Sequence, residues 1–354
     1  MHSDGTQSGG IGRRDFLKIG GAAAAGLLAG GADPEPARAA TLPPLPLNPA
    51  TQGAMPTRNL GRTGYRPGIF SLGGQAAVER PDNEAVAVPI VERALDLGVN
   101  YVDTAAAYGG PQRWSQRYIG QVMARRRREV FLTSKTNDRT KDGSLRLLDE
   151  SLRLLNTDHL DLWQLHNIST MAQVDQITGP GGALEALTQA RDQRMVRFLG
   201  LTGHADPAPL MELIRRFPFD TILMALNAAD PHRMPFATEL LPMAVERQMG
   251  IIGMKIPARG GILSTWAPPA PGAPRGFGPG AATRPGAITI QEAMYYTLSQ
   301  PVTTVIIGCD SPAQVEENVR LAQAFTPLNA SQLAALEART QVVAQQSLFF
   351  RRWT

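Results

Sequence analysis

Cysteine is nearly absent from this chain, which has only Cys309 among its 354 residues. A single thiol cannot close an internal disulfide, so the class of small disulfide-stabilised proteins is excluded. The sequence also contains no Cys and His cluster with the spacing of a zinc or iron–sulfur site, and we therefore predict that the protein holds no metal.

An excess of charge of one sign is also lacking, because 35 basic and 31 acidic residues are interleaved to give a net charge of +4. The one run of like charge is residues 125–128, RRRR, and no aromatic residue alternates with it, as binding to single-stranded nucleic acid would require. We interpret the run as a solvated helix end favoured by the helix dipole, and predict no nucleic-acid partner.

Long hydrophobic runs are missing as well. The apolar stretch at residues 19–32 is 14 residues long, which is too short to span a bilayer comfortably, so we predict no stable membrane anchor. Arg13-Arg14 precede this stretch and Ala37-Arg38-Ala39 follow it. Together they predict a signal peptide of the twin-arginine (Tat) type over residues 1–39, with the Tat translocation machinery as a partner and a periplasmic or secreted location. A disordered tail that stays attached is the alternative.

After a proline-rich, extended lead-in over residues 40–56, short apolar segments alternate with helical runs to the end of the chain. The alternation predicts an α/β fold with parallel strands joined by right-handed crossovers. With 43% hydrophobic residues, residues 57–354 can form one (β/α)8 barrel of about 250 residues with extensions. Eight strands are expected. The first ends at 71–74, and the other seven lie near 99–103, 130–134, 160–165, 197–201, 221–226, 251–255 and 304–307. Helices are expected over 113–124, 143–155, 182–195, 207–217, 235–249, 290–300 and 312–325, with one before the second strand that becomes regular only around Pro89.

Four segments lie outside this repeat. Residues 55–60 and 65–70 flank Gly61-Arg62-Thr63-Gly64 and predict a hairpin. Residues 257–286 are dense in proline and glycine and too long for a simple connection, so we expect a lid or a cofactor-covering loop after strand 7. Residues 329–346 predict an extra C-terminal helix, and the aromatic tail after it is expected to pack on the barrel.

Four side chains that can take part in acid–base chemistry lie at or just beyond the ends of three successive strands: Asp103, Tyr108, Lys135 and His166. Each has a structural explanation when taken alone, since aspartate caps strand ends and tyrosine packs in cores. Their order and spacing resemble the catalytic tetrad of the aldo-keto reductases, and the resemblance runs from about residue 57 to residue 325. It implies a (β/α)8 TIM barrel closed at the bottom by a hairpin, and an oxidoreductase that uses NAD(P).

The resemblance also implies a role for each member of the tetrad. Tyr108 would act as the general acid/base in hydride transfer between a nicotinamide and a carbonyl. Lys135 is expected to lower the tyrosine pKa from its usual value near 10, and Asp103 to hold Lys135 charged. His166 would orient the carbonyl oxygen of the substrate.

The same resemblance places the cofactor across the ends of strands five to eight. The segment 307–318 (IGCDSPAQVEEN) resembles the family's adenosine-binding segment, with Gly308, Asp310 and Ser311 near the ribose and Gln314, Glu317 and Asn318 on the adenosine. Three features depart from the family pattern: strand five ends in Thr202-Gly203-His204, Leu223 replaces a glutamine, and strand seven ends in Met254-Lys255. Thr202 and Lys255 are expected to contact the nicotinamide.

The lysine or arginine that usually binds the 2′-phosphate of NADP is missing from this segment, where Asp310 stands instead. We therefore expect NAD(H) to be tolerated at least as well as NADP(H), although arginines at 259, 275 and 284 in the long loop leave a phosphate contact open. Export in a folded state further predicts that the cofactor is tightly bound, loaded before export and regenerated in place.

The leading functional hypothesis is an exported NAD(P)-dependent oxidoreductase that interconverts a small carbonyl compound (an aldehyde, a ketone or a sugar) and its alcohol. The alternative is an exported NAD(P)-binding barrel that serves as a structural or sensing subunit without turnover.

Overall fold

The computed structural model describes residues 41–265 and 284–352, which belong to one compact unit. The predicted signal peptide and residues 266–283 of the predicted covering loop lie outside the described residues. Within the described part, no helix has both the length and the apolar character needed to cross a membrane.

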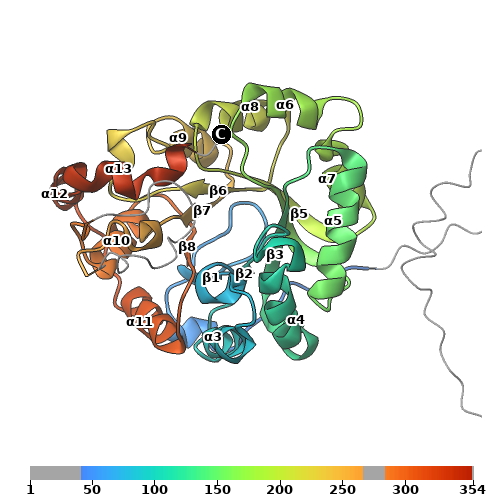
Figure 1. The fold of residues 1–354 in the computed structure, drawn as a ribbon, viewed down its shortest axis with the longest axis horizontal. Helices are drawn as coiled ribbons and strands as arrows, with labels where there is room; N and C mark the ends of the chain where they lie inside the picture. Colours follow the sequence, from blue (N-terminus) through green and yellow to red (C-terminus); the bar gives the residue numbers. More distant parts are fainter. Residues whose placement is uncertain (1–40, 266–283, 353–354) are drawn as a thin grey trace, which may run out of the picture. The chain divides into compact units, whose positions relative to one another are not determined.

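Eight parallel strands close into a barrel in sequence order, with β8 pairing back onto β1 (Figure 1). The strands are β1 (Phe70–Gly73), β2 (Tyr101–Asp103), β3 (Phe131–Thr136), β4 (Leu160–Leu165), β5 (Val196–Gly203), β6 (Thr221–Ala225), β7 (Gly250–Met254) and β8 (Thr304–Ile307). All residues of seven of them are buried, because the helices cover the outside while side chains fill the inside. The (β/α)8 TIM barrel, predicted from the alternation of strands and helices together with the family resemblance, is confirmed.

The helices form the outer ring around these strands (Figure 1). They are α3 (Glu84–Asp96), α4 (Trp114–Arg126), α5 (Lys141–Leu154), α7 (Ala183–Asp192), α8 (Pro207–Arg216), α9 (Leu240–Glu246), α10 (Ile290–Leu298) and α11 (Pro312–Gln323). One helix was not predicted, and another is shorter than predicted. A further helix, α6 (Met171–Thr178), precedes α7; it is only two turns long and buries just Val174 and Ile177, so its periodic signal is weak. Helix α9 is half the expected length.

The expectation that Pro89 delays the start of the helix before β2 was wrong. Helix α3 begins at Glu84 and carries Pro89 in its interior. The proline removes one backbone hydrogen bond near the beginning of the helix. Burial of Ile90, Val91 and Leu95 against the barrel outweighs that loss.

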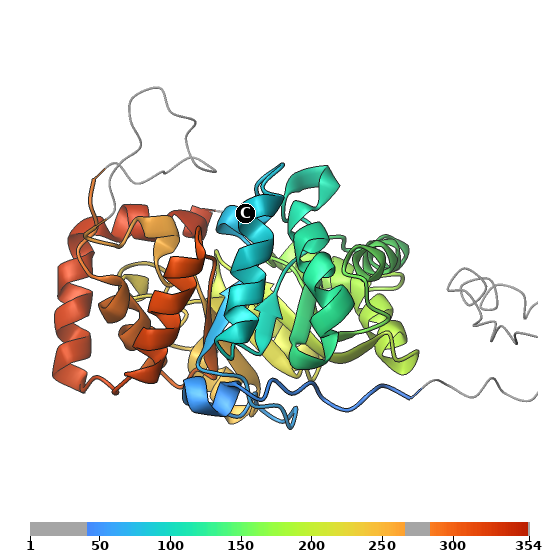
Figure 2. The same cartoon turned by 90° about the horizontal axis from the view of Figure 1, so that it is seen from below.

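The lead-in and the predicted hairpin lie at the N-terminal end of the barrel. Thr51 Oγ1 donates to Gly98 O just before β2, at 2.8 Å, and the short helix α2 (Thr51–Ala54) lies at this end in Figure 2. The hairpin is present as an antiparallel bridge between Thr57 and Gly68. Its turn packs so closely on β7 that a side chain at Gly61 would lie 2.2 Å from the amide nitrogen of Gly250.

The chain after β8 adds α12 (Ala330–Thr340), a 3-10 turn (Gln341–Val343), α13 (Ala344–Ser347) and a second 3-10 turn, η7 (Phe349–Arg352). The predicted C-terminal helix is thus present up to Thr340 and then breaks into short turns. Phe349 and Phe350 are buried, as the expected packing of the tail requires.

Candidate active site

The four tetrad residues meet at the carboxyl end of the barrel. Asp103 is the last residue of β2, Lys135 lies in β3, His166 directly follows β4, and Tyr108 lies in the loop after β2. Lys135 Nζ is 2.5 Å from Asp103 Oδ2 and 3.5 Å from the Tyr108 hydroxyl. The rings of Tyr108 and His166 make an edge contact, with centroids 5.7 Å apart.

The ion pair between Asp103 and Lys135 is almost completely buried, and each side chain is 1% exposed. Further hydrogen bonds satisfy both partners: Thr133 Oγ1 donates to Asp103 Oδ1 at 2.8 Å, and Lys135 Nζ donates to Thr104 O at 2.8 Å. A buried charge pair needs such additional partners to offset its desolvation. The lysine is therefore held in one position, facing Tyr108.

The pKa of Tyr108 does not follow the sequence prediction. Burial raises it well above its usual value, the negative charges of Asp103 and Glu79 raise it further, and Arg259 opposes them. Lys135 was expected to lower this pKa, but its charge is paired with Asp103 at a shorter distance than that to the phenol. Tyr108 in the site without ligand is consequently a neutral phenol, which is the protonation state of a proton donor.

His166 is held as a neutral imidazole. Burial lowers its pKa well below 6.5, and the positive charges of Lys135, Arg139 and Lys255 lower it further. Its backbone amide donates to Thr136 O at 2.8 Å, which fixes the residue next to the end of β3. A neutral imidazole at this position can donate a hydrogen bond to a carbonyl oxygen.

A second group of polar side chains, of which only Lys255 was identified as functional from the sequence, faces the tetrad from the β1 end. Lys255 Nζ, directly after β7, donates to Gln75 Oε1 at 3.2 Å, and Gln75 Nε2 lies 3.2 and 3.3 Å from the two carboxylate oxygens of Glu79. Burial and the neighbouring Arg259 lower the pKa of Lys255 to about 7. In the sequence, the position of Gln75 and Glu79 just after the first strand was the only indication that they could belong to the site.

The two residues expected to contact the nicotinamide, Thr202 and Lys255, lie at the carboxyl ends of β5 and β7. Thr202 is the penultimate residue of β5 and is fully buried; its hydroxyl accepts from the Asn167 amide at 2.9 Å and keeps its own proton to donate. Lys255 adopts a left-handed backbone conformation with φ of 64°, and Arg259, four residues on, has φ of 55°. Such strain is typical of functional loops.

The expected adenosine segment forms the turn from β8 into α11. Ser311 caps the helix by accepting from the Gln314 amide, and Gln314 Oε1 accepts from the Asp310 amide at 2.7 Å. Gly308 packs against the β1 loop, where an added Cβ would lie 3.1 Å from Gln75 O. Glu317 is exposed on α11. Asn318 is 4% exposed and donates to Cys309 Sγ at 3.5 Å, so its side chain stabilises the turn between β8 and α11.

Asp310 has a partner that sequence reasoning missed. Arg80, in the connection between β1 and α3, forms an ion pair with it at 2.7 Å, and both side chains are about half exposed. A basic side chain from another part of the chain therefore lies beside the expected adenosine segment. The proximity of two segments more than 200 residues apart could not be deduced from the spacing of charges.

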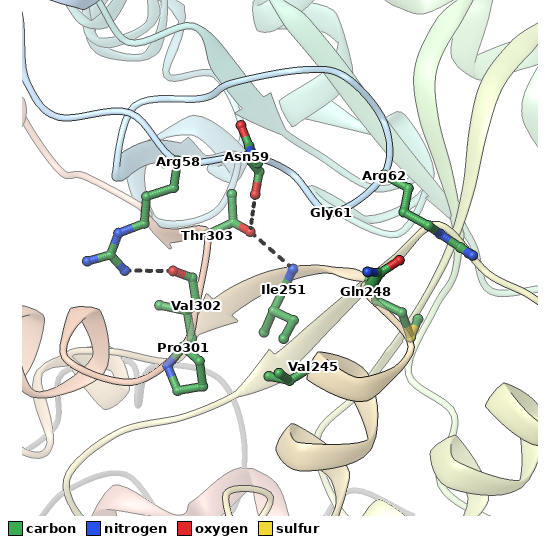
Figure 3. Close-up of a pocket in the computed structure, with 11 residues that line it drawn as sticks. Arg58, Asn59, Gly61, Arg62, Val245, Gln248, Ile251, Pro301, Val302 and Thr303 are labelled. Carbon is green, nitrogen blue, oxygen red and sulfur yellow. Dashed lines mark hydrogen bonds between the residues drawn. The ribbon is translucent and has the colours of Figure 1, made fainter.

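Two other features lie outside this site. In the described part of the chain, no group of three or more His, Cys, Asp or Glu side chains is arranged to hold a metal ion. A hollow of about 410 Å³ opens at the opposite, N-terminal end of the barrel, between the hairpin and the starts of β7 and β8 (Figure 3). Arg58 on its wall donates to Val302 O at 2.7 Å and Leu298 O at 2.9 Å, and so caps the end of α10.

Comparison with known proteins agrees with this geometry. The model of the Aldo/keto reductase family matches residues 67–274, more than half of the chain. The protein therefore belongs to the aldo-keto reductases, a family of NAD(P)-dependent oxidoreductases.

Two curated relatives span most of the barrel. An uncharacterized oxidoreductase, YqkF of Bacillus subtilis, is 25% identical over 72% of this chain and 88% of its own length. L-galactose dehydrogenase of Arabidopsis thaliana is 27% identical over 74% of this chain and 86% of its own length.

Among solved structures, the holo form of aldo-keto reductase AKR11C1 from Bacillus halodurans superimposes with a TM-score of 0.64 at 24% identity, covering 81% of this chain and 96% of that one. The glycerol dehydrogenase AKR11B4 from Gluconobacter oxydans gives a TM-score of 0.63 at 19% identity, covering 81% and 95%. At these identities the likeness supports the fold alone.

Proposed function

We propose that the protein catalyses hydride transfer between a nicotinamide cofactor and a small carbonyl compound, with Tyr108 as the general acid/base. The observation that carries this proposal is the chain of contacts from Asp103 through Lys135 to the Tyr108 hydroxyl, at the carboxyl end of the barrel. Active sites of this fold lie at that end. A barrel that only bound the cofactor would not require this buried charge pair beside the phenol.

The residues present fit a dinucleotide. Lys255 supplies a cation at the end of β7, Thr202 a hydroxyl with a proton to donate, and the N-terminus of α11 a partial positive charge that favours phosphate groups. When bound, the nicotinamide supplies or receives the hydride. Gly308, Asp310, Ser311, Gln314, Glu317 and Asn318 remain our proposed contacts for the adenosine half.

The chain's own residues handle the proton and the developing charge. In reduction, the neutral Tyr108 phenol donates its proton to the carbonyl oxygen as negative charge builds there. Lys135 stands 3.5 Å from the phenol oxygen and stabilises the phenolate that remains. Neutral His166 donates to the same carbonyl oxygen and sets its orientation. In oxidation the phenolate takes the proton back.

The substrate is proposed as an aldehyde, a ketone or a sugar. One relative that spans most of the chain is named an L-galactose dehydrogenase, and Gln75, Glu79 and Lys255 give the wall of the site polar groups suited to hydroxylated substrates. The test is steady turnover of a panel of such compounds with added nicotinamide, compared between the native protein and Tyr108→Phe. Cofactor binding without turnover of any of them would favour a structural or sensing subunit.

Export by the Tat route, a periplasmic or secreted location and a tightly held cofactor remain part of this proposal. Their support is the sequence of residues 1–39 and the length of the 257–286 segment. Both lie largely outside the described residues.

The ion pair between Arg80 and Asp310 predicts how the protein chooses its cofactor. A 2′-phosphate near this pair is repelled by Asp310 and attracted by Arg80. Asp310→Asn should tighten NADPH binding relative to NADH, and Arg80→Gln should weaken it. Because both side chains are half exposed and screened by solvent, we expect changes of only about three- to tenfold.

Fluorescence titration of NADPH and NADH at a fixed salt concentration measures the ratio of their dissociation constants. The matched control is Arg93→Gln, which breaks a comparably exposed ion pair with Glu316 between α3 and α11. This substitution should leave the ratio of the NADPH and NADH dissociation constants unchanged. An unchanged ratio in both Asp310→Asn and Arg80→Gln would place the 2′-phosphate elsewhere.

The low pKa of Lys255 predicts that cofactor binding takes up a proton. With a pKa of about 7, only about a tenth of the lysine is charged at pH 8 in the empty site. Asp103 and Glu79 already favour the charged form, while Arg259 and Lys135 oppose it. The phosphates of a dinucleotide add negative charge and shift the balance towards the ammonium.

We therefore expect NADH binding at pH 8 to take up close to one proton per site, and at pH 6 almost none, because Lys255 is then already charged. Calorimetric titration in two buffers of different ionisation enthalpy measures this uptake. Lys255→Met should abolish the difference between pH 8 and pH 6. A proton uptake that persists in that variant would assign the titration to another group.

A further inference from the structure

Three consecutive residues of η7 each contact the end of a different neighbouring strand. The guanidinium of Arg259, in the loop after β7, lies 5.4 Å from the ring centroid of Phe349. The ring of Phe350 lies 6.2 Å from that of His204, directly after β5. Arg351 reaches the end of β6 by donating to Ala225 O at 3.4 Å.

Arg351 makes the strongest of these contacts. Its side chain is fully buried and forms an ion pair with Asp230 in the loop after β6. Its Nη1 donates to His204 O at 2.7 Å, and the guanidinium stacks 3.9 Å from the ring centroid of Phe236. Asp230 in turn accepts from the backbone amides of Phe236 and Ala237, at 3.3 and 3.0 Å. One side chain thus fixes the backbone after β5 and the whole turn after β6.

This position bears on cofactor binding, because the clamped backbone is next to the proposed nicotinamide contacts. His204 is two residues after Thr202, and Arg259 is four residues after Lys255. A shift of the turn after β5 would move the Thr202 hydroxyl, and a shift of the loop after β7 would move the Lys255 ammonium. Binding groups of this kind need support from surrounding contacts to stay within a fraction of an ångström of their productive place.

We propose that Arg351, supported by Phe349 and Phe350, is a positioning residue for the nicotinamide half of the cofactor site. The inference rests on the proposed function, since it assumes that Thr202 and Lys255 meet the nicotinamide. Arg351 acts through His204, Ala225 and Asp230. The adenosine half of the site, on β8 and α11, has no contact with Arg351 among the described hydrogen bonds and ion pairs.

The test compares binding of NADH with binding of ADP-ribose, which carries the adenosine half and lacks the nicotinamide. The variants are Arg351→Gln and Arg351→Lys; the second keeps the charge beside Asp230 and so protects the fold. We expect both to weaken NADH binding at least tenfold while the dissociation constant of ADP-ribose changes less than twofold. The Michaelis constant for cofactor should rise by a similar factor.

A matched control removes a similar ion pair at the other end of the barrel. Arg127 pairs with buried Asp161 and also donates to the carbonyls of Val130 and His159. Arg127→Gln should therefore lower the stability of the fold and leave the cofactor site unchanged. It should lower the melting temperature and leave both dissociation constants unchanged.

Three outcomes would overturn the inference. If Arg351→Lys and Arg351→Gln bind NADH as the native protein does, the residue only stabilises the fold. If they weaken NADH and ADP-ribose equally, or if Arg127→Gln has the same effect on NADH, the loss is general and not positional. If the native protein binds neither ligand, the proposed function fails and this inference fails with it.

Discussion

Tyr108→Phe should lower the turnover number for carbonyl reduction by about 100-fold or more, the usual scale for a positioned acid. The substitution removes only the hydroxyl that lies 3.5 Å from Lys135 Nζ. The ring keeps its edge contact with His166 and its place 4.8 Å from the lysine ammonium. We therefore expect the dissociation constant of the cofactor to change less than twofold, so that the loss is one of proton transfer and not of binding.

A matched control makes the same chemical change at another buried tyrosine. Tyr295 lies on α10, and its hydroxyl donates to Leu321 O at 3.1 Å, remote from the tetrad in sequence and element. Tyr295→Phe should leave turnover within a factor of about two. A loss of less than about fivefold in Tyr108→Phe would remove Tyr108 from the role of general acid.

Lys135→Met should abolish measurable turnover and also destabilise the protein. The methionine fills most of the space of the lysine side chain but leaves the Asp103 carboxylate buried without its counter-charge. Removing one partner of a buried ion pair typically costs about 3 to 5 kcal/mol of unfolding free energy. Thr133 still donates to Asp103, so we expect the lower end of this range, measured by denaturant unfolding at pH 7.

The double variant with Asp103→Asn and Lys135→Met separates the two effects. Without either charge, most of the lost stability should return, because no uncompensated ion remains. Activity should not return, since Tyr108 still lacks the cation that stabilises its phenolate. Recovery of turnover in the double variant would contradict the role proposed for Lys135.

The barrel and its tetrad were accessible from the sequence for a common reason. Parallel strands in a closed barrel present their carboxyl ends on one face, so Asp103, Lys135 and His166 at three successive strand ends had to converge. Thr202 and Lys255, which were proposed as nicotinamide contacts from the resemblance, also lie at strand ends, at β5 and β7. The strand bounds were close to those observed because buried apolar segments between helical runs have few alternatives.

Other features depended on contacts between segments far apart in the chain. Pro89 lies inside α3 because packing on the barrel outweighs its local preference. Burial raises the pKa of Tyr108, and the negative charges of Asp103 and Glu79 raise it further. The lysine that was expected to lower this pKa is paired with Asp103 instead.

By itself, then, the sequence determined the fold class, through the alternation of strands and helices, and it determined the family and its tetrad through their resemblance to the aldo-keto reductases. Only the tertiary structure decided the protonation states of Tyr108 and Lys255, the pairing of Arg80 with Asp310 and the clamp of Arg351 on the ends of β5 and β6. These depend on distances and burial, which the side chains acquire only when the chain has folded.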